Sequence, residues 1–268
     1  MISALQTAVL QVTTACPLSC AQCYMKHTGI HMSLPTARDI LLRAKELGAE
    51  VVQLTGGEPM TYPWLADVVL ACKHLELLSV VATSGIDHHR LRELMDAGLT
   101  AVCVSLNSID PVVNGNTRQL YDQAVAAIRE AVGLELPCFV NLVLTHDSVK
   151  TLRQTANALE DMGVSGLILL KRFPNSEGEG GDELTREEMS AVRDCVCQKR
   201  DFIQVERCCG AYWARYYGLT GPCTEGGRRS AFWNADGTVS PCSQKTGYAY
   251  ATVEAMRADV ERWSGNCN

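Results

Sequence analysis

The segment TAVLQVTTACPLSCAQCY, residues 7–24, joins an apolar run rich in Val and Thr to three closely spaced cysteines. β-Branched residues favour strands, so residues 7–14 are predicted to form a buried strand. Cys16, Cys20 and Cys23 follow directly after this strand. Loops at the carboxyl edge of a parallel sheet or barrel form its active-site mouth, so we expect the three thiols to lie there.

The strand pattern recurs along the chain and alternates with helical spacing. Further strands are predicted over residues 50–54, 77–83, 100–106, 138–145 and 166–171. Between them, apolar residues recur three or four positions apart, as at Ile40, Ala44 and Leu47, which is typical of helices that cover a sheet. Six βα units of this kind predict an α/β fold with a parallel sheet.

Composition excludes several classes of partner. The 268 residues carry 24 Lys and Arg against 30 Asp and Glu, a net charge of −6, which argues against a basic surface for nucleic acid. No apolar run approaches the roughly 20 residues that cross a bilayer. The first basic residue is Lys26, so the N-terminus lacks the positive region of a signal peptide. We therefore predict a cytoplasmic protein with neither a membrane nor a nucleic-acid partner.

The chain has 13 cysteines, which in a reducing compartment indicate metal binding or catalysis instead of disulfides. A structural zinc site needs four ligands, and only His27 and His31 lie near the first three cysteines in sequence. Cys72, Cys103 and Cys138 fall within predicted helices or strands. These three are expected to be buried as small apolar side chains.

The CxxxCxxC spacing of Cys16, Cys20 and Cys23 resembles that of the radical S-adenosylmethionine (SAM) enzymes. The resemblance implies that the three thiolates hold a [4Fe-4S] cluster whose open iron binds the amino and carboxylate groups of SAM. Reduction by a flavodoxin- or ferredoxin-type protein would then cleave SAM to a 5′-deoxyadenosyl radical that abstracts hydrogen from the substrate. The family usually has an aromatic residue before the third cysteine, whereas this chain has Gln22 there and Tyr24 after it.

Short segments after the later strands extend the resemblance. Gly56-Gly57-Glu58-Pro59 resembles the family's GGE[PT] segment, which binds the methionyl amino group of SAM, although two glycines alone also suit an ordinary βα turn. The resemblance places further cofactor contacts at Tyr24, Thr83, Ser84, Ser105, Asn107 and Asn141.

A turn-forming, acidic stretch at residues 173–182 interrupts the βα pattern. We place a domain boundary there, which predicts one domain over residues 1–176 and a second over residues 183–268. In the second, a helix is predicted over residues 185–199 and a hairpin over residues 232–239. Its weak apolar periodicity indicates a small module that folds around a metal centre.

Cysteine spacing in the second domain resembles that of SPASM and twitch auxiliary domains. Cys208 and Cys223 fit the family's CX9-15GX4C element, and NADGTVSPC, ending at Cys242, resembles its second turn. Fewer cysteines follow than in a full SPASM domain, so one auxiliary iron–sulfur cluster, a second [4Fe-4S] centre, is expected. The implied ligands are Cys208, Cys223, Cys242 and Cys267, with Cys209 or Cys197 as alternatives for the last. A structural zinc site could use the same thiolates.

Together these features resemble a partial (β/α)6 radical SAM barrel with a small C-terminal twitch- or SPASM-like domain. Such auxiliary clusters occur chiefly in maturases, so a ribosomally made peptide is the first expected substrate class. A small-molecule dehydrogenase or epimerase acting on an aminocyclitol or sugar is the alternative. A non-catalytic iron–sulfur or zinc protein is a third possibility, which SAM cleavage would exclude.

Overall fold

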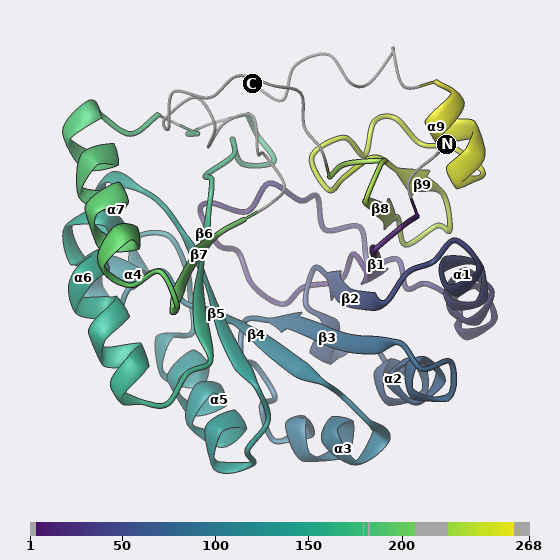
Figure 1. The fold of residues 1–268 in the computed structure, drawn as a ribbon, viewed down its shortest axis with the longest axis horizontal. Helices are drawn as coiled ribbons and strands as arrows, with labels where there is room; N and C mark the ends of the chain where they lie inside the picture. The colour runs from purple at the N-terminus through teal and green to yellow at the C-terminus, as the bar shows by residue number, and fades with distance from the viewer. Residues whose placement is uncertain (1–3, 179, 182, 207–224, 260–268) are drawn as a thin grey trace.

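A curved sheet with helices along its outer side organises the molecule (Figure 1). The computed structural model describes residues 4–178, 180–181, 183–206 and 225–259. Across these residues the sheet has nine strands in the order β7-β6-β5-β4-β3-β2-β1-β8-β9. Their bounds are β1 Thr7–Thr13, β2 Val51–Gly56, β3 Leu78–Thr83, β4 Ala101–Ser105, β5 Cys138–Val143, β6 Gly166–Leu170, β7 Ile203–Val205, β8 Ser230–Trp233 and β9 Val239–Ser240. Every neighbouring pair from β7 to β8 is parallel, and β9 runs antiparallel to β8.

The helices follow the strands and cover the outer side of the sheet (Figure 1). They are α1 Leu34–Glu46, the 3-10 helix η1 Pro59–Thr61, α2 Leu65–His74, α3 Arg90–Ala97, α4 Pro111–Gly115, α5 Tyr121–Gly133, α6 His146–Asp161, α7 Arg186–Gln198 and α9 Val253–Ala258. Local sequence fixes where two of these helices begin. Thr145 and Thr185 form capping boxes that satisfy free backbone N–H groups in the first turns of α6 and α7. The predicted partial barrel is confirmed, with further C-terminal strands added to it.

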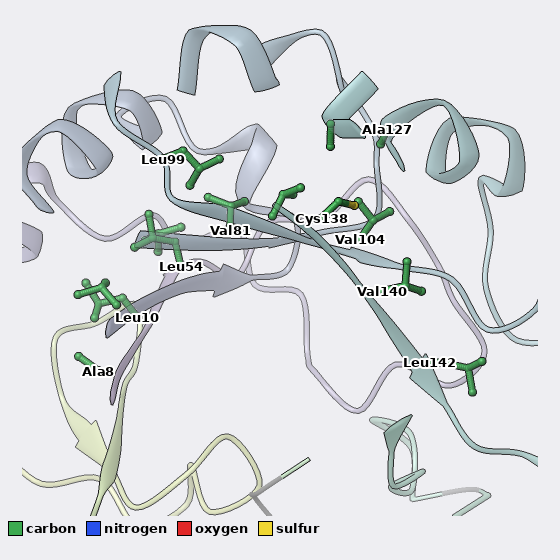
Figure 2. Packing of buried hydrophobic residues seen from close by; sticks show 14 of the residues in the cluster. Ala8, Leu10, Leu54, Val81, Leu99, Val104, Ala127, Cys138, Val140 and Leu142 are labelled. Carbon is green, nitrogen blue, oxygen red and sulfur yellow. The ribbon is translucent and has the colours of Figure 1, made fainter. Parts of the chain in front are cut away.

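The hydrophobic core lies between the strands and these helices. Val81 and Val104, on neighbouring strands, point to the same side as Ala127 of α5 (Figure 2), and all three are fully buried. Burial of each such aliphatic side chain stabilises the fold by about 1.5–3 kcal/mol. The predicted burial of Cys72, Cys103 and Cys138 is confirmed, and burial raises the pKa of each thiol to about 12. These three remain neutral packing residues.

The described part of the C-terminal region continues the barrel sheet. Strand β8 pairs in parallel with β1, from Thr7 opposite Ser230 to Leu10 opposite Trp233. The predicted hairpin is confirmed, since β9 returns antiparallel through a turn in which Gly237 has a φ of +88°. Trp233 belongs to the same core cluster as the barrel residues. The division into two domains stays a prediction, because this hairpin shares both sheet and core with the barrel.

Two sequence predictions differ from the structure at the other edge of the sheet. A seventh strand, β7, pairs in parallel with β6, although the sequence indicated six strands. The turn-forming stretch at which the sequence places a domain boundary lies, through Ser176, against the loop that follows β1, as described below. No described helix is long and apolar enough to span a bilayer.

Candidate active site

The three N-terminal cysteines lie in a loop, residues 14–30, that leaves β1 and returns beside its end; we call it the Cys loop. Its base is closed by hydrogen bonds from Thr14 N to Ile30 O (2.8 Å) and from Ile30 N to Thr14 Oγ1 (2.8 Å). Met32 N then donates to Val12 O at 2.9 Å. In Figure 1 the violet chain after β1 crosses the inner side of the curved sheet. The closed base therefore holds the cysteines at the carboxyl edge of the strands.

The Gly-Gly-Glu segment after β2 docks directly on the start of the Cys loop. Gly57 N donates to Thr13 O at 2.8 Å, and Glu58 N donates to Ala15 O at 2.9 Å. A Cβ added to Gly57 would lie 2.3 Å from Ala15 O, and one added to Gly56 would lie 2.3 Å from Thr13 O. The sequence predicted that these glycines allow a close approach to a ligand. In the structure, the close approach is to the backbone that leads into the Cys loop.

Glu58 is buried, and its carboxylate ties the end of β2 to the end of β3. Oε1 accepts hydrogen bonds from Met60 N (3.0 Å) and Thr83 Oγ1 (2.7 Å). Oε2 accepts from both the backbone N (2.8 Å) and the hydroxyl (2.5 Å) of Ser84. Thr83 and Ser84 thus hold Glu58 in place, and their direct contact with a cofactor stays a prediction.

Asn107 is also buried and connects the Cys loop to two other loops. Its Nδ2 donates to Gln22 Oε1 (2.7 Å) and to Thr117 Oγ1 (2.8 Å), and its Oδ1 accepts from Val143 N (3.0 Å). These bonds use both Nδ2 protons and one of the two acceptor sites of Oδ1. Asn107 thus positions Gln22, and its predicted contact with SAM stays a prediction. Gln22 Nε2 is buried without a hydrogen-bond partner.

The remaining predicted cofactor residues lie at the same edge of the sheet. Ser105 and Asn141 pair at the ends of β4 and β5 and are half-buried. Tyr24 follows the third cysteine, and its ring meets that of Phe173 edge-on at 6.4 Å. Tyr24 and Ser243, which follows the tail cysteine Cys242, line the same cavity. The structure thus brings Tyr24 to the C-terminal hairpin.

The thiols lie close enough to influence one another electrostatically. Burial raises the pKa of Cys16 most, and the nearby Glu58 carboxylate and the thiols of Cys20 and Cys23 raise it further. Burial likewise raises the pKa of Cys23, whose Sγ lies 3.5 Å from His27 Nε2. Metal ligation requires thiolates, so binding at this loop releases protons.

Arg118 is a site residue that the sequence did not indicate. It lies in the loop before α5, and neighbouring Gln119 Oε1 accepts a hydrogen bond from Ser19 N (3.0 Å) in the Cys loop. Burial lowers the pKa of Arg118, while the three nearby thiols and Glu58 act in the opposite direction. Its Nε is buried without a partner. No local pattern could reveal this residue, because only the fold brings its loop to the cysteines.

The segment after β6 completes the surroundings of the Cys loop. Ser176 N donates to Cys23 O at 2.9 Å, and Asn175 Nδ2 donates to Ala21 O at 3.4 Å. Arg172, at the start of this segment, has a buried Nε without a partner. The turn-forming stretch after β6 therefore helps to hold the third cysteine.

Unsatisfied polar atoms test whether this site suits a bound group. Across the described residues, three buried side-chain nitrogens have no partner: Gln22 Nε2, Arg118 Nε and Arg172 Nε. All three belong to the Cys loop or to segments beside it. Buried polar atoms in native proteins are almost always paired, so three orphans at one place indicate room for a polar or charged group. The residues present therefore fit a metal cluster with an amino-acid-bearing cofactor.

Of the expected auxiliary ligands, Cys242 is described and half-buried, whereas Cys208, Cys223 and Cys267 lie outside the described residues, as does Cys209. The alternative ligand Cys197 is exposed on α7, which packs on α6. A cavity of about 320 Å³ separates the Cys loop from the turn after Cys242. It is lined by Gln11, Thr14, Tyr24, Met25, Lys26, Phe232, Asn234, Ser243 and Thr246.

A partial parallel barrel with three thiols after its first strand defines a cofactor-dependent enzyme with its site at the carboxyl edge of the strands. Residues 10–159 match the family model described as the radical SAM superfamily. The chain belongs to this superfamily and is a radical SAM enzyme, which binds a [4Fe-4S] cluster and SAM.

Similar proteins include enzymes with different substrates. The chain is 29% identical over 221 residues to a probable GTP 3′,8-cyclase of Sulfurisphaera tokodaii, covering 77% of this chain and 67% of that protein. It is 25% identical over 248 residues to the PqqA peptide cyclase of Gluconobacter oxydans, covering 87% and 68%. Streptococcus suis SuiB bound to precursor peptide SuiA has the same fold, with a TM-score of 0.77 and 17% identity over 99% of this chain and 66% of SuiB. The chain thus spans about two thirds of the length of these relatives.

Proposed function

We propose that this enzyme modifies a peptide substrate bound between the Cys loop and the C-terminal hairpin. The observation that carries the proposal is the cavity that both segments line, with Tyr24 on one side and Ser243 on the other. Similarity to a PqqA peptide cyclase, and in fold to SuiB with its precursor peptide, supports a peptide as the substrate class. When bound and reduced, the cluster and SAM supply a radical that removes a hydrogen atom from a substrate carbon.

Cys16, Cys20 and Cys23 hold the SAM-binding cluster in this proposal. The backbone of Gly56–Pro59 fixes the first of these thiols through its bonds to Thr13 and Ala15. Glu58 in turn fixes that backbone and the end of β3. These contacts set the position of the cofactor before substrate arrives, which lowers the cost of orienting the reacting atoms.

Arg118 binds the carboxylate of SAM. Its guanidinium lies near the three thiols, and its Nε has no hydrogen-bond partner in the described part of the chain. Charge-assisted bonds from Arg to a carboxylate are short and directional, so they fix a cofactor in one orientation. Gln22 Nε2, which has no hydrogen-bond partner among the described residues, supplies a further donor in the Cys loop.

Cys208, Cys223, Cys242 and Cys267 hold one auxiliary [4Fe-4S] cluster in the module over residues 183–268. The hydrogen bond from Ala235 N to Gln11 Oε1 (3.1 Å) keeps the turn before Cys242 against the barrel. An auxiliary centre at this place could take an electron from a substrate radical in the cavity. A flavodoxin- or ferredoxin-type protein supplies the electrons for SAM cleavage.

The proposal is tested with peptides made from any short reading frames found beside this gene. Reduced, reconstituted enzyme is incubated with SAM and each peptide, in H2O and in D2O, and the products are examined by mass spectrometry. A peptide substrate gives a mass change, or deuterium uptake where the mass in H2O is unchanged. The proposal would be contradicted if 5′-deoxyadenosine forms, but no peptide accelerates its formation and no peptide gives a product.

A small-molecule substrate is the second candidate. The similarity to a probable GTP 3′,8-cyclase favours it, because that relative is named for a nucleotide substrate. An aminocyclitol or sugar dehydrogenase or epimerase belongs to the same class of substrate. Nucleotides and aminocyclitols are added in place of peptides in the same assay. The class of compound that gives a product together with 5′-deoxyadenosine decides between the two candidates.

A further inference from the structure

A second group of metal-ligating side chains lies on the outer helical layer, away from the Cys loop. It consists of His88 and His89, which end the loop from β3 to α3, and Glu130 near the end of α5. One ligand atom from each residue lies within 4.8 Å of the other two. The fold therefore brings two imidazoles and one carboxylate to a single place from residues about 40 positions apart in sequence.

The spacing of these atoms differs from that of a hydrogen-bonded group. His88 Nε2 and His89 Nδ1 each lie 3.6 Å from the same carboxylate oxygen, Glu130 Oε2. N–H···O hydrogen bonds are about 2.7–3.2 Å long, whereas ligand atoms about 2.0–2.1 Å from a tetrahedral zinc are roughly 3.3 Å apart. By contrast, the ordinary pair of His146 Nδ1 and Glu188 Oε2 lies at 2.8 Å.

Ligand chemistry and exposure indicate which ion fits. Imidazole with carboxylate suits zinc and similar divalent transition metals, whereas magnesium and calcium prefer oxygen ligands alone. The side chains of His88 and Glu130 are 18% and 26% exposed, and that of His89 is 81% exposed. An ion can therefore reach the site, and water can complete its coordination.

We propose that His88, His89 and Glu130 bind one divalent transition cation of the zinc class and fasten the loop after β3 to α5. The start of this loop already lies on α5, because a Cβ on Gly85 would be 2.8 Å from Ala124 Cα. Ser84, the preceding residue, holds Glu58 of the active site. The ion thus secures the far end of a loop whose near end supports the cofactor site, and this inference stands independently of the proposed substrate.

Zinc binding to the anaerobically reconstituted enzyme tests the proposal, since the clusters then occupy the cluster-forming thiolates. One molar equivalent of Zn²⁺ is added, unbound metal is removed, and zinc content and X-ray absorption at the zinc edge are measured. We expect about one retained zinc with nitrogen and oxygen neighbours at about 2.0–2.1 Å and no sulfur at about 2.3 Å. Sulfur neighbours, or no retained zinc on folded enzyme, would overturn the proposal.

Variants assign the site. We expect the double variant His88→Asn/His89→Asn to bind zinc more than about tenfold more weakly than the wild type. We expect the same of the conservative variant Glu130→Gln, because each variant removes ligands directly. His146→Asn is the matched control, since it alters a His–Glu pair that is only hydrogen-bonded, and it should bind zinc as the wild type does. Wild-type zinc affinity in folded Glu130→Gln and in the double His variant would refute the assignment.

Discussion

Arg118 places a positive charge beside three thiols and the buried carboxylate of Glu58. The carboxylate oxygens of Glu58 accept hydrogen bonds from Met60, Thr83 and Ser84, so they are not free to pair with the guanidinium. A charge held in a desolvated place without a full set of partners is costly unless a ligand pairs with it. At the scale of single residues, this cost is the strongest physical reason to place the SAM carboxylate at Arg118.

The Arg118→Gln variant should therefore bind SAM more weakly. A hydrogen bond to a charged group contributes about 1.5–3 kcal/mol, which corresponds to roughly a tenfold or greater rise in KM for SAM. The rise is measured through 5′-deoxyadenosine formation at varied SAM, with iron content checked. Arg38→Gln, an exposed change on α1, serves as control. Equal KM values in the two variants would show that Arg118 does not contact SAM.

The sequence indicated Glu58 and Asn107 but not their contacts. Motif spacing identifies which residues matter at a strand end, yet it does not show that Asn107 bonds to Gln22 across 85 positions. Arg118 carried no signal at all, because arginines in loops are normally exposed. Such residues become visible only when the fold brings their loops together.

At the scale of elements, the end of β2 and the start of the Cys loop are held together by backbone contacts that only glycine permits. Gly57→Ala would place a methyl group 2.3 Å from Ala15 O, and backbone cannot move aside as a side chain can. We expect the variant to lose about 1–3 kcal/mol of stability and much of its N-terminal cluster. Denaturant unfolding of the apoprotein and iron content measure the two effects.

Gly133→Ala is the matched control for this substitution. Gly133 ends α5, and a Cβ there meets nothing within 4 Å. Replacing glycine in a helix by alanine leaves stability unchanged or raises it by up to about 1 kcal/mol. If Gly57→Ala were as stable and as iron-rich as Gly133→Ala, the tight docking of β2 on the Cys loop would be wrong.

The predictable elements were those with strong local periodicity. The six predicted strands correspond to β1 to β6 within a few residues, because apolar alternation and helical spacing are local signals. Strand β7 spans three residues, too short for such a signal. The pairing of β8 with β1 joins residues more than 200 positions apart, so the hairpin could be predicted but not its place in the sheet.

At the scale of the whole molecule, that pairing places β8 of the C-terminal region beside β1. Strand β8 leads into the turn before Cys242, and β1 leads into the Cys loop, so neighbouring parallel strands deliver both to one edge. The Cys loop and the segment that contains the hairpin and Ser243 therefore line one cavity. This cavity is the place where we propose that the substrate binds.

Iron content tests whether both centres exist. Two [4Fe-4S] clusters give about eight irons per chain, and a variant with Cys16, Cys20 and Cys23 all changed to Ala should retain about half. Iron and zinc are measured in the anaerobically purified and reconstituted proteins. About four irons with one firmly bound zinc in sulfur coordination would instead make the C-terminal centre a structural zinc site.

The most direct test of the account is SAM cleavage in three reconstituted proteins: the wild type, the Cys16/Cys20/Cys23→Ala variant and Cys242→Ala. After reduction, 5′-deoxyadenosine is quantified, and folding is confirmed by circular dichroism. We predict that the wild type and Cys242→Ala both form 5′-deoxyadenosine, since Cys242 lies in the C-terminal turn and not in the Cys loop. The triple variant should form none, and continued cleavage by a well-folded triple variant would contradict the placement of the radical chemistry at the Cys loop.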